Sequence, residues 1–165
     1  MGRHRIAGLG AGLALAAALA GCANQRTPPP AAPIAAYGWA LMHSPGEGEK
    51  LAYGEPNTDN VVILLVCKPR SGLVQVLVPG HQPGSRPVRL ASGGKSLSIV
   101  VRPPTGDDEP DLLRTDLKAD DPILAGFAAR GDLAILDGGQ RTALPVRPSE
   151  RDLASRFLAA CKSSA

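Results

Sequence analysis

The sequence predicts a mainly β domain, a β-sandwich-like antiparallel sheet accompanied by two short helices. Three observations predict this fold class. Apolar runs of strand length recur between turns rich in Gly and Pro, one segment alternates apolar and polar side chains, and helical signals occur only late in the chain. The 165 residues leave room for a single domain with its own core.

Four strands are expected in the first half of the domain. Segments 37–43 and 50–53 are short and end at Gly- and Pro-containing loops. Residues 61–67 are an unbroken apolar run, and their β-branched content predicts a central strand buried on both faces. Residues 73–78 resume the apolar pattern after a five-residue loop, so these last two strands are expected to form a hairpin.

Five strands are predicted after this hairpin. Residues 88–91 favour an edge strand, and 112–117 a further strand. Residues 95–102 alternate in polarity, which indicates a half-buried antiparallel strand. Its apolar side chains are Leu97, Ile99 and Val101. Residues 133–136 and 141–146 flank an Asp-Gly-Gly turn and are interpreted as a second hairpin.

Capping signals predict a short helix at 122–130. Asp121 can cap its first turn, Pro122 suits the first helical position, and Gly131 follows its last residue.

A C-terminal helix is predicted at 149–162. Ser149 and Asp152 have the spacing of a capping box. The spacing i, i+4, i+8 places three side chains on one stripe that faces the core. These are Leu153, Phe157 and Cys161.

The N-terminus has the layout of an export signal. Arg3 and Arg5 precede an apolar run over residues 6–20. The run is shorter than the roughly 20 residues that a membrane-spanning helix needs. It ends in Leu-Ala-Gly-Cys22, which resembles the lipobox of bacterial lipoproteins. The resemblance implies cleavage before Cys22 and a diacylglycerol on its thiol; an ordinary cleaved signal and an uncut anchor are the alternatives.

The lipobox divides the chain into three parts. Residues 1–21 are the expected signal peptide, 22–36 a lipidated Cys with a Pro/Ala-rich tether, and 37–165 one β-rich domain. Two or more acyl chains give stable anchoring. Residue 23 is Ala rather than Asp, which by analogy with Gram-negative sorting implies the outer membrane, facing the periplasm.

With Cys22 assigned to lipid, Cys67 and Cys161 remain as a pair in an oxidising compartment. We expect them to form a disulfide; two separate buried thiols are the alternative. The chain has no Cys-x-x-Cys motif, so the expected role of the pair is structural.

A second resemblance concerns the domain itself. A Trp is followed by Tyr-Gly-x-Pro-x-Thr-Asp, by an apolar strand that ends in Cys, and by a terminal Phe-x-x-x-Cys. These residues are Trp39, Tyr53 to Asp59, Cys67, Phe157 and Cys161. The pattern resembles small, mostly uncharacterised two-cysteine envelope proteins of Gram-negative bacteria, in which a Ser usually stands where this chain has Thr58. More distantly, it resembles invasion- and secretion-associated periplasmic β-sandwich proteins. It implies the fold and the disulfide but no activity.

The charge gives no sign of a nucleic-acid partner. Loss of Arg3 and Arg5 with the signal lowers the basic count from 18 to 16 against 15 acidic residues, so the net charge falls from +3 to +1. No basic stripe with interleaved aromatic residues is present. Lys68, Arg70, Arg86 and Arg89 are interpreted as solubilising charge, with a patch for anionic lipid or glycan as the alternative.

No catalytic, cofactor or metal motif is found, and no catalytic or metal-binding residue is assigned. A hydrolase would need His43 or His81 near a Ser or carboxylate in a cleft, and a Gly-x-Ser-x-Gly elbow is missing. The acidic residues in 107–111 favour a solvated loop over a calcium site. The segment around Tyr53 could shape a ligand surface or place that ring in the core.

The expected function is therefore that of a non-enzymatic envelope lipoprotein. It would be held to the membrane by its lipid and bind another envelope protein or a cell-wall component. An inhibitor of a secreted or periplasmic enzyme is the first alternative, and a hydrolase of unknown substrate is the second.

Overall fold

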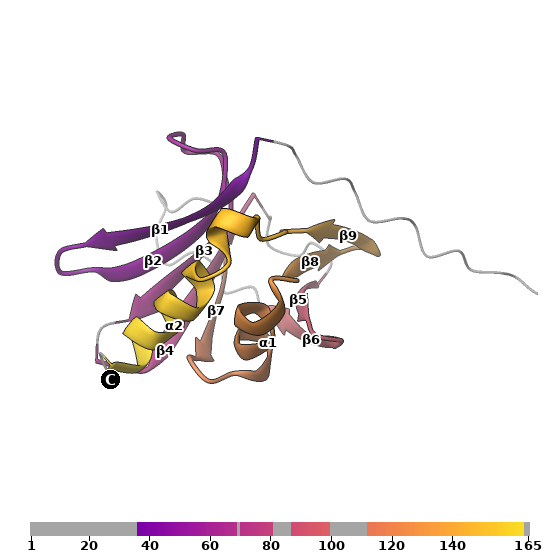
Figure 1. The fold of residues 1–165 in the computed structure, drawn as a ribbon. Coiled ribbons are helices and arrows are strands. Elements are labelled where there is room, and N and C mark those ends of the chain that lie inside the picture. The colour runs from indigo at the N-terminus through magenta and orange to yellow at the C-terminus, as the bar shows by residue number, and fades with distance from the viewer. Residues whose placement is uncertain (1–35, 69, 81–86, 100–111, 164–165) are drawn as a thin grey trace, which may run out of the picture.

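Five antiparallel strands form the larger sheet, in the spatial order β1-β2-β3-β4-β7 (Figure 1). Their bounds are β1 Gly38–Ser44, β2 Gly48–Gly54, β3 Val61–Lys68, β4 Leu73–Pro79 and β7 Leu112–Lys118. The computed structural model describes residues 36–68, 70–80, 87–99 and 112–163. The predicted signal peptide and residues 22–35 of the predicted tether, with Cys22, lie outside these residues. The predicted mainly β fold and the β3–β4 hairpin are confirmed.

A second, four-stranded antiparallel sheet has the order β6-β5-β8-β9. Its strands are β5 Val88–Ser92, β6 Lys95–Ile99, β8 Ala134–Asp137 and β9 Gln140–Ala143. Asp137 pairs with Gln140, so Gly138 and Gly139 alone form the turn. Their φ angles of 55° and 91° are positive, as a type I′ hairpin turn requires. This hairpin is confirmed, whereas positions 100–102 of the predicted strand 95–102 lie outside the described residues.

Helix α1, Pro122–Arg130, has the predicted bounds. The Asp121 side chain accepts a hydrogen bond from the N–H of Ile123 at 2.8 Å. Gly131 adopts the left-handed conformation at φ 68°, and its N–H donates to the carbonyl of Phe127. The cap, the proline and the glycine thus act as their order in the sequence indicates.

Helix α2, Leu153–Ser163, begins later than the predicted residue 149. A 3-10 turn, η1 (Pro148–Glu150), precedes it. The Arg147 N–H donates to Glu150 Oε2 at 3.0 Å. Arg147 and Glu150 thus make the capping contact that was predicted for Ser149 and Asp152. The Asp152 carbonyl instead accepts the first α-helical bond, from Arg156.

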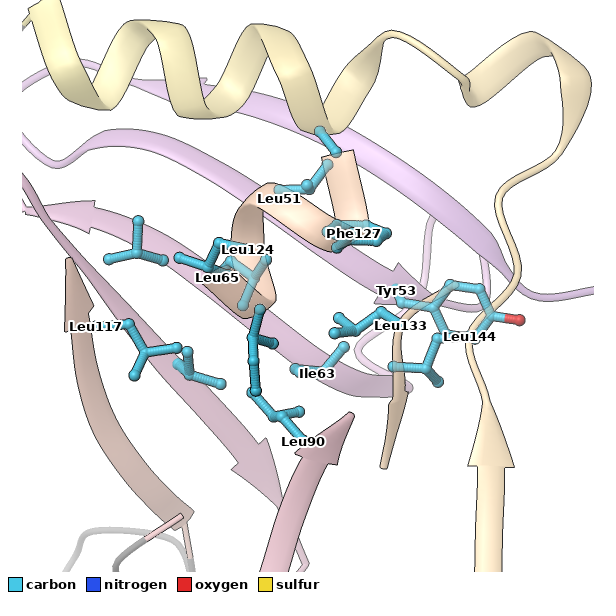
Figure 2. Close-up of a cluster of buried hydrophobic side chains, with 14 of the residues drawn as sticks. Leu51, Tyr53, Ile63, Leu65, Leu90, Leu117, Leu124, Phe127, Leu133 and Leu144 are labelled. Carbon is cyan, nitrogen blue, oxygen red and sulfur yellow. The ribbon is translucent and has the colours of Figure 1, made fainter. Parts of the chain in front are cut away.

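The core lies between the inner face of the larger sheet, the two helices and the smaller sheet. Figure 2 shows side chains from both sheets and α1 converging there. Fully buried members include Leu51, Ile63, Leu65, Leu90, Leu124, Phe127, Leu133 and Leu144. Burial of each such side chain contributes about 1.5–3 kcal/mol.

Strand β3 is buried on one face only. Ile63, Leu65 and Cys67 are buried, whereas the alternate Leu64 and Val66 are half-buried. The prediction of burial on both faces is wrong, because the helices and the smaller sheet join the core on the inner face. An apolar run alone does not distinguish a doubly covered strand from one whose second face is half-open.

The Cys67–Cys161 disulfide joins β3 to α2 across 94 residues, with a Cα–Cα distance of 5.4 Å. Phe157 and Cys161 are fully buried on the inward stripe of α2. The predicted disulfide is confirmed, and it fastens the end of α2 to a central strand of the sheet.

Candidate functional site

A groove of about 420 Å³ lies between the β1–β2 hairpin and α2. It is lined by Leu41, His43, Glu49, Leu153, Arg156 and Ala160. Three of these side chains are apolar and three carry polar or charged groups. A groove of this composition can hold an apolar side chain and fix its polar neighbours.

Two periodicities bring these residues together. Leu41 and His43 are two positions apart on β1, so both point to the inner face of the sheet. Leu153, Arg156 and Ala160 have the spacing i, i+3, i+7, so they share one side of α2. The groove is the space between this side of the helix and the hairpin.

His43 and Glu49 form a cross-strand pair at the rim. They stand opposite each other in the β1–β2 register, and His43 Nδ1 lies 2.9 Å from Glu49 Oε1. The His43 side chain is 67% exposed and that of Glu49 26%. The carboxylate therefore orients an imidazole ring that solvent and a ligand can reach.

Arg156 provides a positive charge on the opposite wall. Its Nη1 lies 3.5 Å from Asp152 Oδ2, and the two side chains are 63% and 65% exposed. Such a surface ion pair contributes at most about 1 kcal/mol. The guanidinium can therefore exchange this partner for a carboxylate of a ligand.

The disulfide sets the position of the helical wall. Cys161 is adjacent to Ala160 in the groove and is bonded to Cys67 of β3. Because β3 pairs with β2, and β2 with β1, the helix and the hairpin are connected through covalent bonds and two ladders of hydrogen bonds. The disulfide holds α2 to β3, and strand pairing holds β1 to β3 through β2, so the distance between α2 and β1 is fixed.

A second hollow, of about 210 Å³, lies on the outer face of the same hairpin. Ala40, Met42 and Ala52 contribute to its lining, together with the 54–58 turn and with Arg147 and Glu150. Met42 is 42% exposed. Strand β1 therefore has a hollow beside it on each face of the sheet.

The Tyr-Gly-x-Pro-x-Thr-Asp segment forms the turn that borders this outer hollow. Gly54 lies against the following chain, where a Cβ would be 2.4 Å from the carbonyl oxygen of Asn60. Thr58 Oγ1 donates to the carbonyl of Glu55 and accepts from the N–H of Asn60. A Ser hydroxyl makes the same two bonds, so Thr58 preserves the turn.

The aromatic residues of the pattern belong to the core. Trp39 Nε1 donates to the carbonyl of Leu144 at 3.2 Å, and its ring lies 5.2 Å from that of Tyr53 and 4.7 Å from that of Phe127. Burial raises the pKa of Tyr53 above its usual value. Of the two interpretations of Tyr53, placement in the core is confirmed.

Among the other candidate residues, those that the structure describes do not line the groove. His81, Arg86 and the acidic residues of 107–111 lie outside the described residues. Lys68 pairs with Asp116 at 2.9 Å on the larger sheet, whereas Arg89 lies in the smaller sheet and bonds Ser96. Within residues 36–163, leaving out the undescribed segments, no three His, Cys, Asp or Glu side chains are placed to hold a metal ion.

The sequence offered no direct signal for the groove. His43 is the one groove residue that the sequence marks as a candidate for chemistry, and Glu49 precedes the predicted strand 50–53. The observed ladder extends beyond the predicted strands and so pairs His43 with Glu49. Placing α2 beside them requires the tertiary fold.

Comparisons with protein-family models, with curated proteins and with solved structures found no match. No helix in the described part of the chain is long and apolar enough to cross a membrane.

Proposed function

We propose that this protein is a lipid-anchored, non-enzymatic binding module of the cell envelope, and that the groove between β1 and α2 is its binding site. The observation that carries the proposal is the groove itself, with an apolar floor of Leu41, Leu153 and Ala160 and a charged rim. Apolar pockets with a few convergent polar groups are the usual form of a binding site.

The lipid anchor supports an envelope partner. A diacylglyceryl group on Cys22 and the Pro/Ala-rich tether would hold the domain within about 45 Å of the bilayer, at about 3.1 Å per extended residue. The accessible partners are then envelope proteins and cell-wall components. The outer membrane, facing the periplasm, is the location that Ala23 favours.

Site-specific photo-crosslinking in cells tests the binding role. A photoreactive amino acid replaces Arg156 at the groove or, as the matched control, Lys95 at the exposed start of β6. We expect a discrete light-dependent adduct from position 156 and none from position 95. Absence of an adduct from position 156, and from neighbouring positions 41 and 153, would refute a binding role for the groove.

The His43–Glu49 pair favours a hydrolase as the second candidate. A carboxylate that orients a histidine is one part of a general-base arrangement. Purified protein is assayed against a panel of chromogenic esters and fluorogenic peptides, with His43→Ala as the comparison. Turnover that disappears in the variant while the fold is retained would favour the hydrolase; equal rates for both proteins would remove it.

A further inference from the structure

Strand β1 is an unprotected sheet edge. It is the first strand in the order of the larger sheet, and in the described part of the chain only β2 pairs with it. Its sequence, Gly-Trp-Ala-Leu-Met-His-Ser, contains no Lys, Arg, Asp, Glu or Pro. Its register with β2 continues without a bulge over all seven residues. The turn η1 packs against its first residues, so the row of backbone donors and acceptors that it offers runs along residues 40–44.

The other three edges carry the usual protection against pairing. Strand β7 presents Arg114, Asp116 and Lys118. Strand β6 has five residues and begins with Lys95, and β9 has only four residues, including Arg141. Among the sheet edges in the described part of the chain, the unprotected one is thus β1, the strand with a hollow beside it on each face.

An extended peptide fits this combination. Successive side chains of a strand point to opposite faces of the sheet. A strand added beside β1 would send one set of side chains toward the groove with Leu41 and Leu153, and the alternate set toward the outer hollow with Ala40 and Met42. Backbone hydrogen bonds then give affinity and the two hollows give sequence preference.

We propose that β1 binds an extended peptide segment of another envelope protein by strand addition. The proposal rests on the proposed binding function and names the class of its partner. The groove selects an aliphatic side chain opposite Leu41, where Leu153 and Ala160 supply apolar walls. Two positions along, opposite His43, it selects an acidic side chain that pairs with Arg156.

The tether of this chain is a poor occupant for the same edge. Pro28, Pro29, Pro30 and Pro33 lack the N–H groups that a ladder needs. A second copy of β1 has its backbone N–H groups but no acidic residue. It would therefore place His43 or Trp39, rather than a carboxylate, near Arg156. The acidic position is therefore what distinguishes a partner peptide from a copy of the chain.

The probe is a phage-displayed library of eight-residue segments with Thr fixed at alternate positions and the others randomised. Selection against the detergent-solubilised full chain should enrich an aliphatic and an acidic residue two positions apart. N-methylation of the selected peptide at amides along one edge should weaken binding about tenfold, the loss of about one hydrogen bond, and along the other edge should have little effect.

Variants locate the binding site. Met42→Lys adds an edge charge at an exposed position and should weaken peptide binding about fivefold, whereas Ser98→Lys on β6, the matched control, should leave it unchanged. Arg156→Gln should weaken the acidic peptide about two- to fivefold and have no effect on its amide analogue. Circular dichroism verifies that each variant is folded.

Three results would overturn the proposal. The first is peptide binding that Met42→Lys and N-methylation both leave unchanged. The second is enrichment of sequences without the aliphatic–acidic pattern. The third is a dimer in solution that Met42→Lys dissociates and that excludes the peptide, which would assign the edge to a second copy. A crosslink at Arg156 together with any of these results would retain the binding function while refuting strand addition.

Discussion

Single glycines determine how the chain approaches itself. Gly54 allows the end of β2 to lie against the backbone of Asn60 and Val61, where a Cβ would be 2.4 Å from one atom and 3.0 Å from another. Both neighbours are backbone atoms and cannot move aside as a flexible side chain could. The glycine of the Tyr-Gly-x-Pro segment is therefore explained by close packing.

Gly54→Ala should lower the free energy of unfolding by about 1–3 kcal/mol, because the added methyl forces the 55–60 turn away from β2. Urea denaturation measures the loss. Gly46→Ala is the comparison: its φ of 84° imposes conformational strain, but nothing lies within 4 Å of the new Cβ. A Gly54→Ala protein as stable as the wild type would contradict the close-packing explanation.

The Asp132 carboxylate connects the end of β5, the turn that follows it and the end of helix α1. Ser92 Oγ donates to its Oδ1 at 2.5 Å, while the Gly93 N–H at 3.0 Å and Arg130 Nε at 3.3 Å donate to its Oδ2. Partial burial would raise the pKa of this carboxyl, but the hydrogen bonds and the positive charge of Arg130 outweigh it and hold the pKa below its usual value.

Because this pKa is lower in the folded protein than in the unfolded chain, the ionised carboxylate stabilises the fold above about pH 4. That contribution is lost as the pH falls through the lower, folded pKa. Asp132→Asn should cost about 1–2 kcal/mol at pH 6, since weaker hydrogen bonds replace charge-assisted ones. The difference from the wild type should decrease toward pH 3 in urea titrations; a constant difference would contradict the linkage.

At the scale of elements, α2 and its disulfide decide the shape of the groove. Cys161 and Phe157 are fully buried on the stripe that contacts the sheet. Leu153, at the first turn, is only half-buried, because its side of the helix faces the groove. The covalent bond thus holds the end of the helix while the groove opens along its length.

Replacing both Cys67 and Cys161 with Ala should lower the free energy of unfolding by up to about 4–5 kcal/mol, the chain-entropy value for a closed loop near 100 residues. Equilibrium unfolding of wild type, reduced wild type and the double variant measures the effect, and the last two should coincide. Non-reducing mass analysis that finds two free thiols in exported protein would contradict the pairing.

Local signals in the sequence predicted most elements. Asp121, Pro122 and Gly131 defined α1 at both ends because caps act within one turn. The start of α2 was misplaced because Arg147, which is not a usual capping residue, takes the cap position and a 3-10 turn intervenes. The groove was not predicted because Leu41 and Leu153 meet only through the packing of α2 on the sheet, which no local pattern specifies.

At the scale of the whole molecule, the chain enters β1 at the end of the sheet opposite the C-terminus of α2 (Figure 1). The groove lies along β1 toward its far end, at Leu41 and His43. The first residue of β1 and the groove residue His43 therefore lie at different ends of the strand.

Cys22→Ser should abolish lipid attachment, because the thiol that would accept the lipid is lost. Cell fractionation and incorporation of labelled palmitate measure the change. We expect the wild type in the membrane fraction and labelled, and the variant unlabelled and in the soluble fraction if an alternative cleavage removes its signal, or retained as an uncleaved precursor. A labelled Cys22→Ser protein would contradict the lipobox assignment.

The disulfide also has a mechanical consequence. If the protein is anchored as proposed, tension on the anchor would enter the domain at Tyr37 and run lengthwise along β1, so the hydrogen bonds between β1 and β2 would be loaded together in shear rather than opened one at a time. If they failed, the chain could lengthen only up to Cys67, by about 100 Å for some 30 residues at about 3.5 Å each. Beyond that point the Cys67–Cys161 bond transmits the load directly to α2, so a force borne at the C-terminal helix bypasses the residues between the two cysteines.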